Sequence, residues 1–141
     1  MKKNFLKFVI LVVILVLIVT IYTTKSNFTK GTTIDMQGKD DIVSVSLNMN
    51  TGYDNELVVK LVTEEFESPS QVFVDILAKD KSIYTNKLEK EENDNFPQFG
   101  IYKDNFDSIR DLEKNYKDIS VSVTFSEQSV QIPLTSIKIL E

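Results

Sequence analysis

The sequence predicts a mainly β protein in which an N-terminal transmembrane helix is followed by an antiparallel, immunoglobulin-like β-sandwich with one short helix. Three observations predict this fold class: an uninterrupted apolar run over residues 5–22, later segments that alternate apolar and polar residues, and turn-forming residues about every ten positions. The prediction concerns architecture only, because the chain has no cysteine and no tryptophan, the residues that mark antibody-type domains.

The apolar run over residues 5–22 contains one charged side chain, Lys7, and residues 8–19 are all Val, Ile, Leu or Phe. A helix of this length rises about 27 Å, close to the thickness of the hydrocarbon core of a bilayer. A cleaved signal peptide usually has a shorter apolar core and an alanine-containing cleavage site, whereas the first alanine of this chain is Ala78. We therefore expect an uncleaved signal anchor, with a cleaved secretory signal as the alternative.

The lysines beside this run predict its orientation. Lys2, Lys3 and Lys7 precede or enter it, so the positive-inside rule places the N-terminus in the cytoplasm and the rest of the chain outside. The expected location is the cell membrane, with a single pass. The chain then divides into a cytoplasmic n-region and signal anchor (1–22), a flexible polar tether (23–33) and an extracytoplasmic β-sandwich domain (34–141).

Composition excludes several classes of function. Without the three N-terminal lysines, 13 basic residues remain against 21 acidic ones, a net charge of −8 that disfavours nucleic acid as a partner. The chain has no histidine and no cysteine, which removes Ser-His and Cys-His nucleophiles and the commonest metal ligands. We expect no cofactor, no metal and no enzymatic activity.

Alternation of apolar and polar residues predicts the first strands of the domain. Residues 42–49 and 56–63 each place apolar side chains on one face, and the turn cluster 50–55 between them contains Gly52, which can adopt a positive φ. These segments predict a β-hairpin.

Further strands are expected over residues 71–78 and 82–88, with a short one around 99–102. The 71–78 segment is apolar on both faces, because Phe73 and Leu77 alternate with its other apolar residues. We therefore expect a central position for it in a sheet.

One helix of about ten residues is expected between residues 104 and 117. The apolar residues Phe106, Ile109, Leu112 and Tyr116 follow helical spacing there, and Asp104 or Asn105 is placed to cap the N-terminus.

The clearest strand of the sequence covers residues 118–126, and a last strand is expected over 130–140. Pro133 interrupts this last strand, and because proline cannot donate a backbone hydrogen bond it marks an edge or a bend.

Aromatic residues in two turn regions form the candidate partner-binding surface. These residues are Tyr53, Phe96, Phe99 and Tyr102. Exposed aromatic side chains anchor protein partners or stack on sugars. The alternative is that they close the open end of the sandwich, since phenylalanine is usually buried.

Acidic clusters give weaker candidate sites. Glu64, Glu65 and Glu67, together with Asp54 or Asp80, could supply oxygen ligands for Ca²⁺, but their spacing matches no calcium-binding loop, and a solvated acidic turn is the favoured interpretation. A pair of carboxylates could also serve a glycoside hydrolase.

The function expected from these features is binding. The chain is interpreted as a membrane-anchored extracytoplasmic interaction module, for example an accessory subunit of a cell-envelope complex, held by residues 5–22 and recognising a protein partner. The alternatives are a carboxylate-dependent surface hydrolase and an immunity or inhibitor protein at the membrane.

Overall fold

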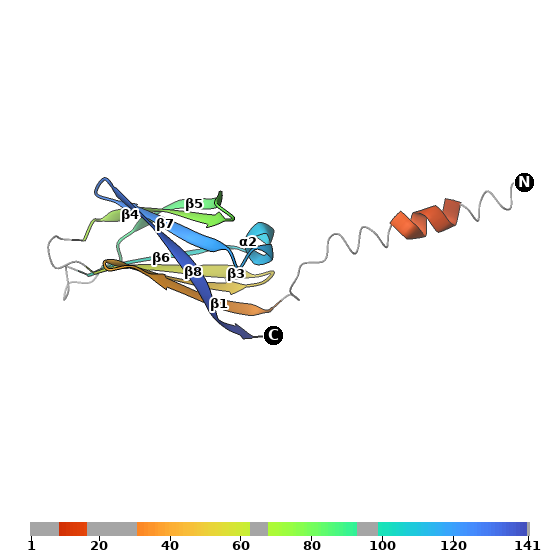
Figure 1. The fold of residues 1–141 in the computed structure, drawn as a ribbon, viewed down its shortest axis with the longest axis horizontal. Helices are drawn as coiled ribbons and strands as arrows, with labels where there is room; N and C mark the ends of the chain where they lie inside the picture. The colour runs from red at the N-terminus through yellow and green to blue at the C-terminus, as the bar shows by residue number, and fades with distance from the viewer. Residues whose placement is uncertain (1–8, 17–30, 63–67, 93–98, 141) are drawn as a thin grey trace, which may run out of the picture.

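The computed structural model describes residues 9–16, 31–62, 68–92 and 99–140, and it is mainly β. Eight strands form one antiparallel sheet that curves into a nearly closed barrel (Figure 1). Their order in the sheet is β5-β4-β7-β8-β1-β2-β3-β6. The elements are β1 (Thr33–Lys39), β2 (Val43–Asn50), β3 (Asp54–Val62), β4 (Gln71–Ala78), β5 (Lys81–Glu89), β6 (Phe99–Asp107), α2 (Arg110–Lys114), β7 (Ile119–Phe125) and β8 (Gln128–Leu140).

The apolar N-terminal run is described only over residues 9–16, which are helical with exposed side chains. Its remaining residues, and residues 23–30 of the expected tether, lie outside the described part of the chain. Within residues 9–16, 31–62, 68–92 and 99–140, no helix has the length and apolar content needed to cross a bilayer.

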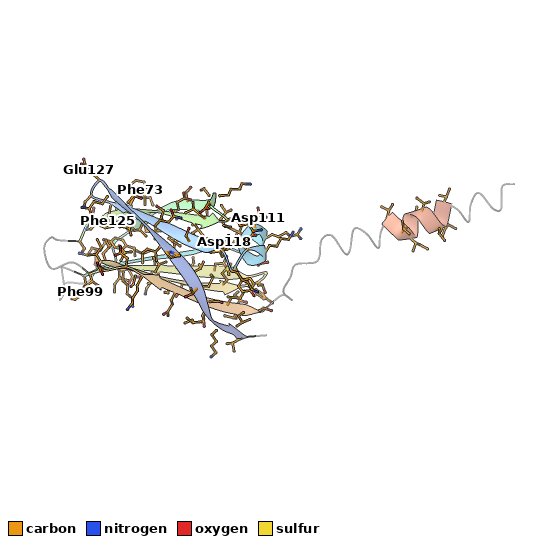
Figure 2. All side chains as sticks on the ribbon, viewed as in Figure 1. Phe73, Phe99, Asp111, Asp118, Phe125 and Glu127 are labelled. Carbon is orange, nitrogen blue, oxygen red and sulfur yellow. The ribbon has the colours of Figure 1, made fainter. Side chains whose placement is uncertain are left out.

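Alternation produces the core of the barrel. In β2, β3 and β7 every second residue is buried, and these residues are apolar except for Asn55 at the start of β3. The buried side chains fill the space between the two sides of the curved sheet (Figure 2). The central position expected for residues 71–78 is confirmed, because β4 pairs with β5 on one side and β7 on the other.

The longest strand, β8, joins the two sides of the barrel. Residues 128–134 pair with β7, whereas residues 135–140 pair with β1, and Figure 1 shows β8 running diagonally between the two sides. The change of partner occurs between Leu134 and Thr135, one residue after Pro133, where a bend was expected. This continuous order differs from the immunoglobulin-like arrangement, in which the strands divide between two separate sheets.

The two ends of the sheet order, β5 and β6, meet along a seam. An isolated bridge pairs Lys90 with Tyr102. The rings of Tyr84 and Phe106 stack with their centroids 4.2 Å apart, and the Tyr84 hydroxyl donates a hydrogen bond to Asp104. Side chains therefore close most of the gap that backbone pairing leaves open.

The helix expected between residues 104 and 117 is present, but it is shorter than ten residues and begins later than Asp104 or Asn105. The structure has a five-residue helix, α2, and its N-cap residue, Ile109, makes no side-chain capping bond. Asp104 and Asn105 lie in β6, which pairs with β3 as far as Asp107. The hydrogen bonds between β3 and β6 stabilise these residues as a strand. A short helix over the same residues would be only marginally stable by itself, even though its apolar residues have helical spacing.

Candidate binding surfaces

The predicted aromatic surface does not form one patch. Tyr53 lies in the β2–β3 turn with 52% of its surface exposed, whereas Phe99 is half-buried and faces Val62 at the other end of β3. About nine strand residues separate the two ends of β3, a distance of roughly 27 Å. Phe96 lies outside the described residues. Tyr53 and Phe99 could therefore contact one partner only if that partner spanned the length of the barrel.

Tyr102 is fully buried and belongs to the seam. Its hydroxyl donates a hydrogen bond to the carbonyl oxygen of Pro69, just before β4. Burial raises the pKa of Tyr102 to about 12, and a hydrogen bond with the Ser68 side chain opposes this change. A Cβ atom on Gly100 would lie 2.6 Å from the Tyr102 hydroxyl oxygen, so glycine makes room for the ring. Tyr102 thus holds β6 to the segment before β4.

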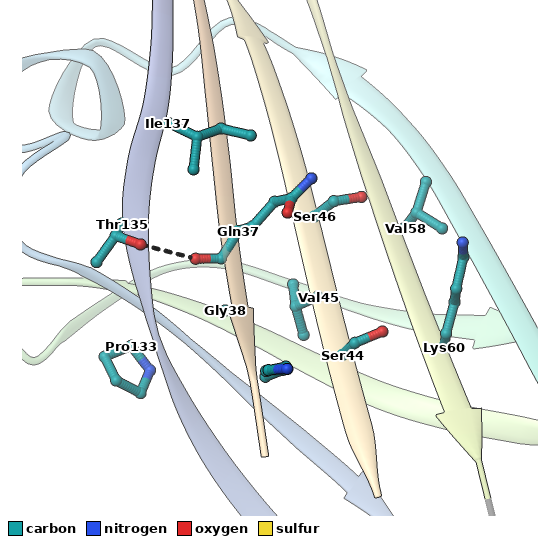
Figure 3. A pocket seen from close by; sticks show the side chains of 11 residues that line it. Gln37, Gly38, Ser44, Val45, Ser46, Val58, Lys60, Pro133, Thr135 and Ile137 are labelled. Atoms are coloured by element: carbon teal, nitrogen blue, oxygen red, sulfur yellow. Dashed lines mark hydrogen bonds between the residues drawn. The ribbon is translucent and has the colours of Figure 1, made fainter. Parts of the chain in front are cut away.

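A groove of about 570 Å³ lies on the face of β8, β1, β2 and β3 that points away from the core, and we call it the outer groove (Figure 3). Ser44 and Ser46 are two of the small side chains on β2 that line it. Val58 on β3 and Ile137 on β8 add apolar surface. The complete lining is Gln37, Gly38, Lys39, Ser44, Val45, Ser46, Val58, Lys60, Pro133, Thr135 and Ile137.

Two lysines give one end of the outer groove a positive charge. The strand register places Lys39 and Lys60 on either side of Ser44, on neighbouring strands. Neither lysine forms a salt bridge with another described residue. The other end of this sheet face is acidic, with Asp35 accepting a hydrogen bond from Asn48. The groove therefore suits a ligand with an anionic group and a small apolar part.

A second candidate surface surrounds Phe73 on the outward face of β4, and we call it the Phe73 face. The Phe73 side chain is 57% exposed, although the apolar pattern of its strand suggested cover on both faces. The adjoining hollow has a volume of about 340 Å³. Its lining residues are Phe73, Val74, Asp75, Thr85, Asn86, Lys87, Ser122 and Thr124.

Hydroxyl groups surround this exposed ring. Ser129 makes hydrogen bonds of 3.1 Å with both Ser122 and Thr124, so three strand side chains are held in fixed positions. An exposed aromatic ring among ordered hydroxyls can anchor a protein partner or stack on a sugar. The sequence contained a signal for this exposure, because period-two alternation puts Phe73 on the same face as Asp75.

Carboxylates do not gather in either hollow. The outer groove has no Asp or Glu among its lining residues, and the hollow at the Phe73 face has only Asp75. Among the residues that the structure describes, no three Asp or Glu side chains are placed to hold a metal ion. Glu64, Glu65 and Glu67 lie outside the described residues.

Comparisons with known proteins assign no family to the chain. No protein-family model matches it, and no curated protein and no solved structure is significantly similar to it. The outer groove and the Phe73 face are therefore judged by their own chemistry.

Proposed function

We propose that the chain is a single-pass membrane protein whose C-terminal β domain binds a protein partner outside the membrane. In this proposal residues 5–22 span the bilayer with the N-terminus in the cytoplasm, and residues 23–30 act as a tether. The extracytoplasmic interaction domain begins at residue 31 rather than at residue 34, because Gly31 and Thr32 form backbone hydrogen bonds with Thr51 and β1 starts at Thr33. A partner in the same cell envelope, such as another subunit of an envelope complex, fits this arrangement.

One observation carries the anchor. Residues 9–16 are helical and apolar, and each side chain is between 39% and 63% exposed. A helix that is apolar on every face is stable where all its faces meet an apolar environment, and a bilayer supplies one. The flanking residues of the same run extend the apolar sequence to a length that can cross a bilayer.

The binding role is supported by the surfaces of the β domain. Phe73 exposes more than half of its ring, and aromatic residues of this kind supply much of the energy in protein interfaces. The outer groove adds Lys39 and Lys60, which form no salt bridge with any residue that the structure describes and can recognise an acidic side chain of a partner.

Cysteine labelling tests the topology, because the chain has no natural cysteine. Glu89→Cys, at an exposed position of β5, should react with a membrane-impermeant maleimide on intact cells. Lys2→Cys should react only after the membrane is permeabilised. The reverse pattern would contradict the orientation, and a shortened chain that has lost the Lys2→Cys label would show that the signal is cleaved.

Photo-crosslinking in cells tests binding and locates its surface. A photoreactive amino acid placed at Phe73 or Lys60 should capture a defined protein, to be identified by mass spectrometry. Tyr53 and Phe99 provide comparison positions at the two ends of the barrel. Phe73→Ser should then reduce capture from Lys60 if both positions face one partner. A protein that captures nothing from any of the four positions would contradict a role in binding.

A further inference from the structure

The last six residues of β8, residues 135–140, pair with another described strand on one side only, and we call them the β8 tail. On one side the tail pairs with β1, with a register shift between Asp35 and Met36. Pairing of β8 with β7 stops at Leu134. Among the described residues, no strand pairs with the other side of the tail. Backbone donors and acceptors on that side are available to another strand.

The tail is also unusually apolar for an exposed strand. All six of its side chains are exposed, and three of them are large and apolar: Ile137 at 60%, Ile139 at 41% and Leu140 at 49%. Natural proteins protect exposed edges with charges, proline or cover, but Lys138 is the only charged residue of the tail. The β5–β6 seam shows such protection, with side chains crossing it.

We propose that a second copy of this chain pairs with the β8 tail, so that two tails form an antiparallel pair around a twofold axis. Symmetry restricts the register, because one residue must lie opposite itself. With Ile137 opposite Ile137, Lys138 lies opposite Ser136, and the two lysines are kept apart. The next symmetric register would place Lys138 opposite Lys138, which is unfavourable in a strand pair.

The position of the tail allows two membrane-anchored chains to pair. Leu140 pairs with Thr33, so the tail ends beside the point where the chain enters β1. In the proposed dimer both entry points lie near its centre, with three strand spacings, or about 14 Å, between the two β1 strands. This step rests on the proposed membrane anchor. A six-residue strand pair is a small interface, and tethering to one membrane raises the local concentration enough for it to form.

Disulfide trapping gives a direct test, because the chain contains no cysteine that could react in the background. The variant Ile137→Cys should form a covalent homodimer under mild oxidation of membranes that contain the full-length chain. Residues directly opposite each other in an antiparallel pair have Cα atoms about 4.5–5.5 Å apart, within the range of a disulfide. Phe73→Cys and Val62→Cys, at positions 57% and 45% exposed, are controls that should stay monomeric.

Sedimentation of the detergent-solubilised full chain provides a second measurement. We expect a concentration-dependent dimer, and Ile137→Lys should shift it to monomer. At dilutions where both proteins are monomeric they should melt at the same temperature, because Ile137 is mostly exposed. Val62→Lys, which adds the same charge elsewhere, should leave the dimer intact. A monomer at all concentrations, equal trapping of the three cysteine variants, or trapping of Ile137→Cys only with a different protein would each overturn the proposal. The topology labelling does not depend on dimer formation, so the two proposals fail separately.

Discussion

Replacing Gly38 by alanine should strongly destabilise the barrel, because Gly38 lies where β8 crosses from one side of the sheet to the other. A Cβ atom at this position would lie 2.3 Å from the carbonyl oxygen of Pro133. It would also lie 2.7 Å from Ile132 Cγ2 and 3.0 Å from Leu134 Cδ2. All three contacts come from consecutive residues of β8, so the methyl group of alanine would clash with β8 where it crosses β1.

The size of the effect follows from the nearest contact. The Pro133 oxygen belongs to the backbone and cannot rotate away, so β1 and β8 must separate by about 1 Å to reach an ordinary contact distance. Overpacking of a core costs about 1–3 kcal/mol and sometimes more, and a contact with backbone favours about 3 kcal/mol here. For a domain near 100 residues this corresponds to a fall in melting temperature of roughly 12 °C or more.

Thermal unfolding of the full-length chain in detergent, followed by circular dichroism, measures this change. Gln37→Ala is a matched control, because Gln37 is the preceding residue of β1 and its side chain is exposed. Without the steric conflict, exchanging a strand glycine for alanine would stabilise the fold by a few tenths to about 1 kcal/mol. A Gly38→Ala protein that melts at or above the wild-type temperature would therefore refute the account of the crossing.

Two other predictions concern the seam and the β7–β8 turn. Tyr102→Phe should lower stability by about 1–3 kcal/mol at neutral pH, because the partly buried Pro69 oxygen loses its donor. Burial raises the pKa of both Tyr84 and Tyr102 to about 12, from 10.0 for an unperturbed tyrosine. The folded chain therefore holds these protons more tightly than the unfolded chain, so stability should fall as pH rises from about 10 to about 12. Denaturant titrations at several pH values should show this fall in the wild type and a shallower one in Tyr102→Phe; equal slopes would contradict the assignment. Glu127→Gly should raise the melting temperature, because Glu127 has a φ of 65°, a region that costs a residue other than glycine roughly 1 kcal/mol. Glu56→Gly, at an exposed position inside β3, should lower it in the same assay, and a lower melting temperature for Glu127→Gly would refute the turn argument.

Strands with regular alternation were predictable from the sequence. The structure places β2, β3 and β7 within two residues of the expected segments 42–49, 56–63 and 118–126. In each of them an apolar face packs into the core and a polar face meets solvent, so the local pattern carries the whole signal.

The first strand escaped prediction because its pattern is short. Only Ile34 and Met36 of β1 are buried apolar residues, and Gly38 then replaces the third inward side chain. The reason for this glycine is the passage of β8, which is about 100 residues away in the sequence. No local window contains that information.

The end of β6 was missed because its inward positions are partly polar. Asp104 accepts hydrogen bonds from Tyr84 and Asn86 across the seam, so a carboxylate stands where alternation would predict an apolar residue. Phe106 then matched a helical spacing with Ile109 and Leu112, although it stacks on Tyr84 from a strand. The role of these residues follows from the contact between β5 and β6, and a single segment of the sequence does not reveal that contact.

Of the two candidate surfaces, the sequence contains a signal for one and none for the other. Exposure of Phe73 could be derived from its strand, because Asp75 shares its face. The outer groove could not, since it brings together side chains from β1, β2, β3 and β8. Tyr102 was grouped with exposed turn aromatics in the sequence, whereas its ring is buried and its hydroxyl bonds to Pro69, 33 residues earlier in the chain.

The β8 tail exists because β8 is longer than the strand β7 with which it pairs. β8 has 13 residues, whereas its partner β7 has 7, so β8 continues after β7 has run out of pairing positions. The crossing at Gly38 sets the course of these extra residues, because it sends residues 135–140 along the start of β1. No strand of the described chain pairs with their other side. A strand in this position either needs protecting charges or a partner, and with Lys138 as its only charge the tail has the composition of a pairing surface.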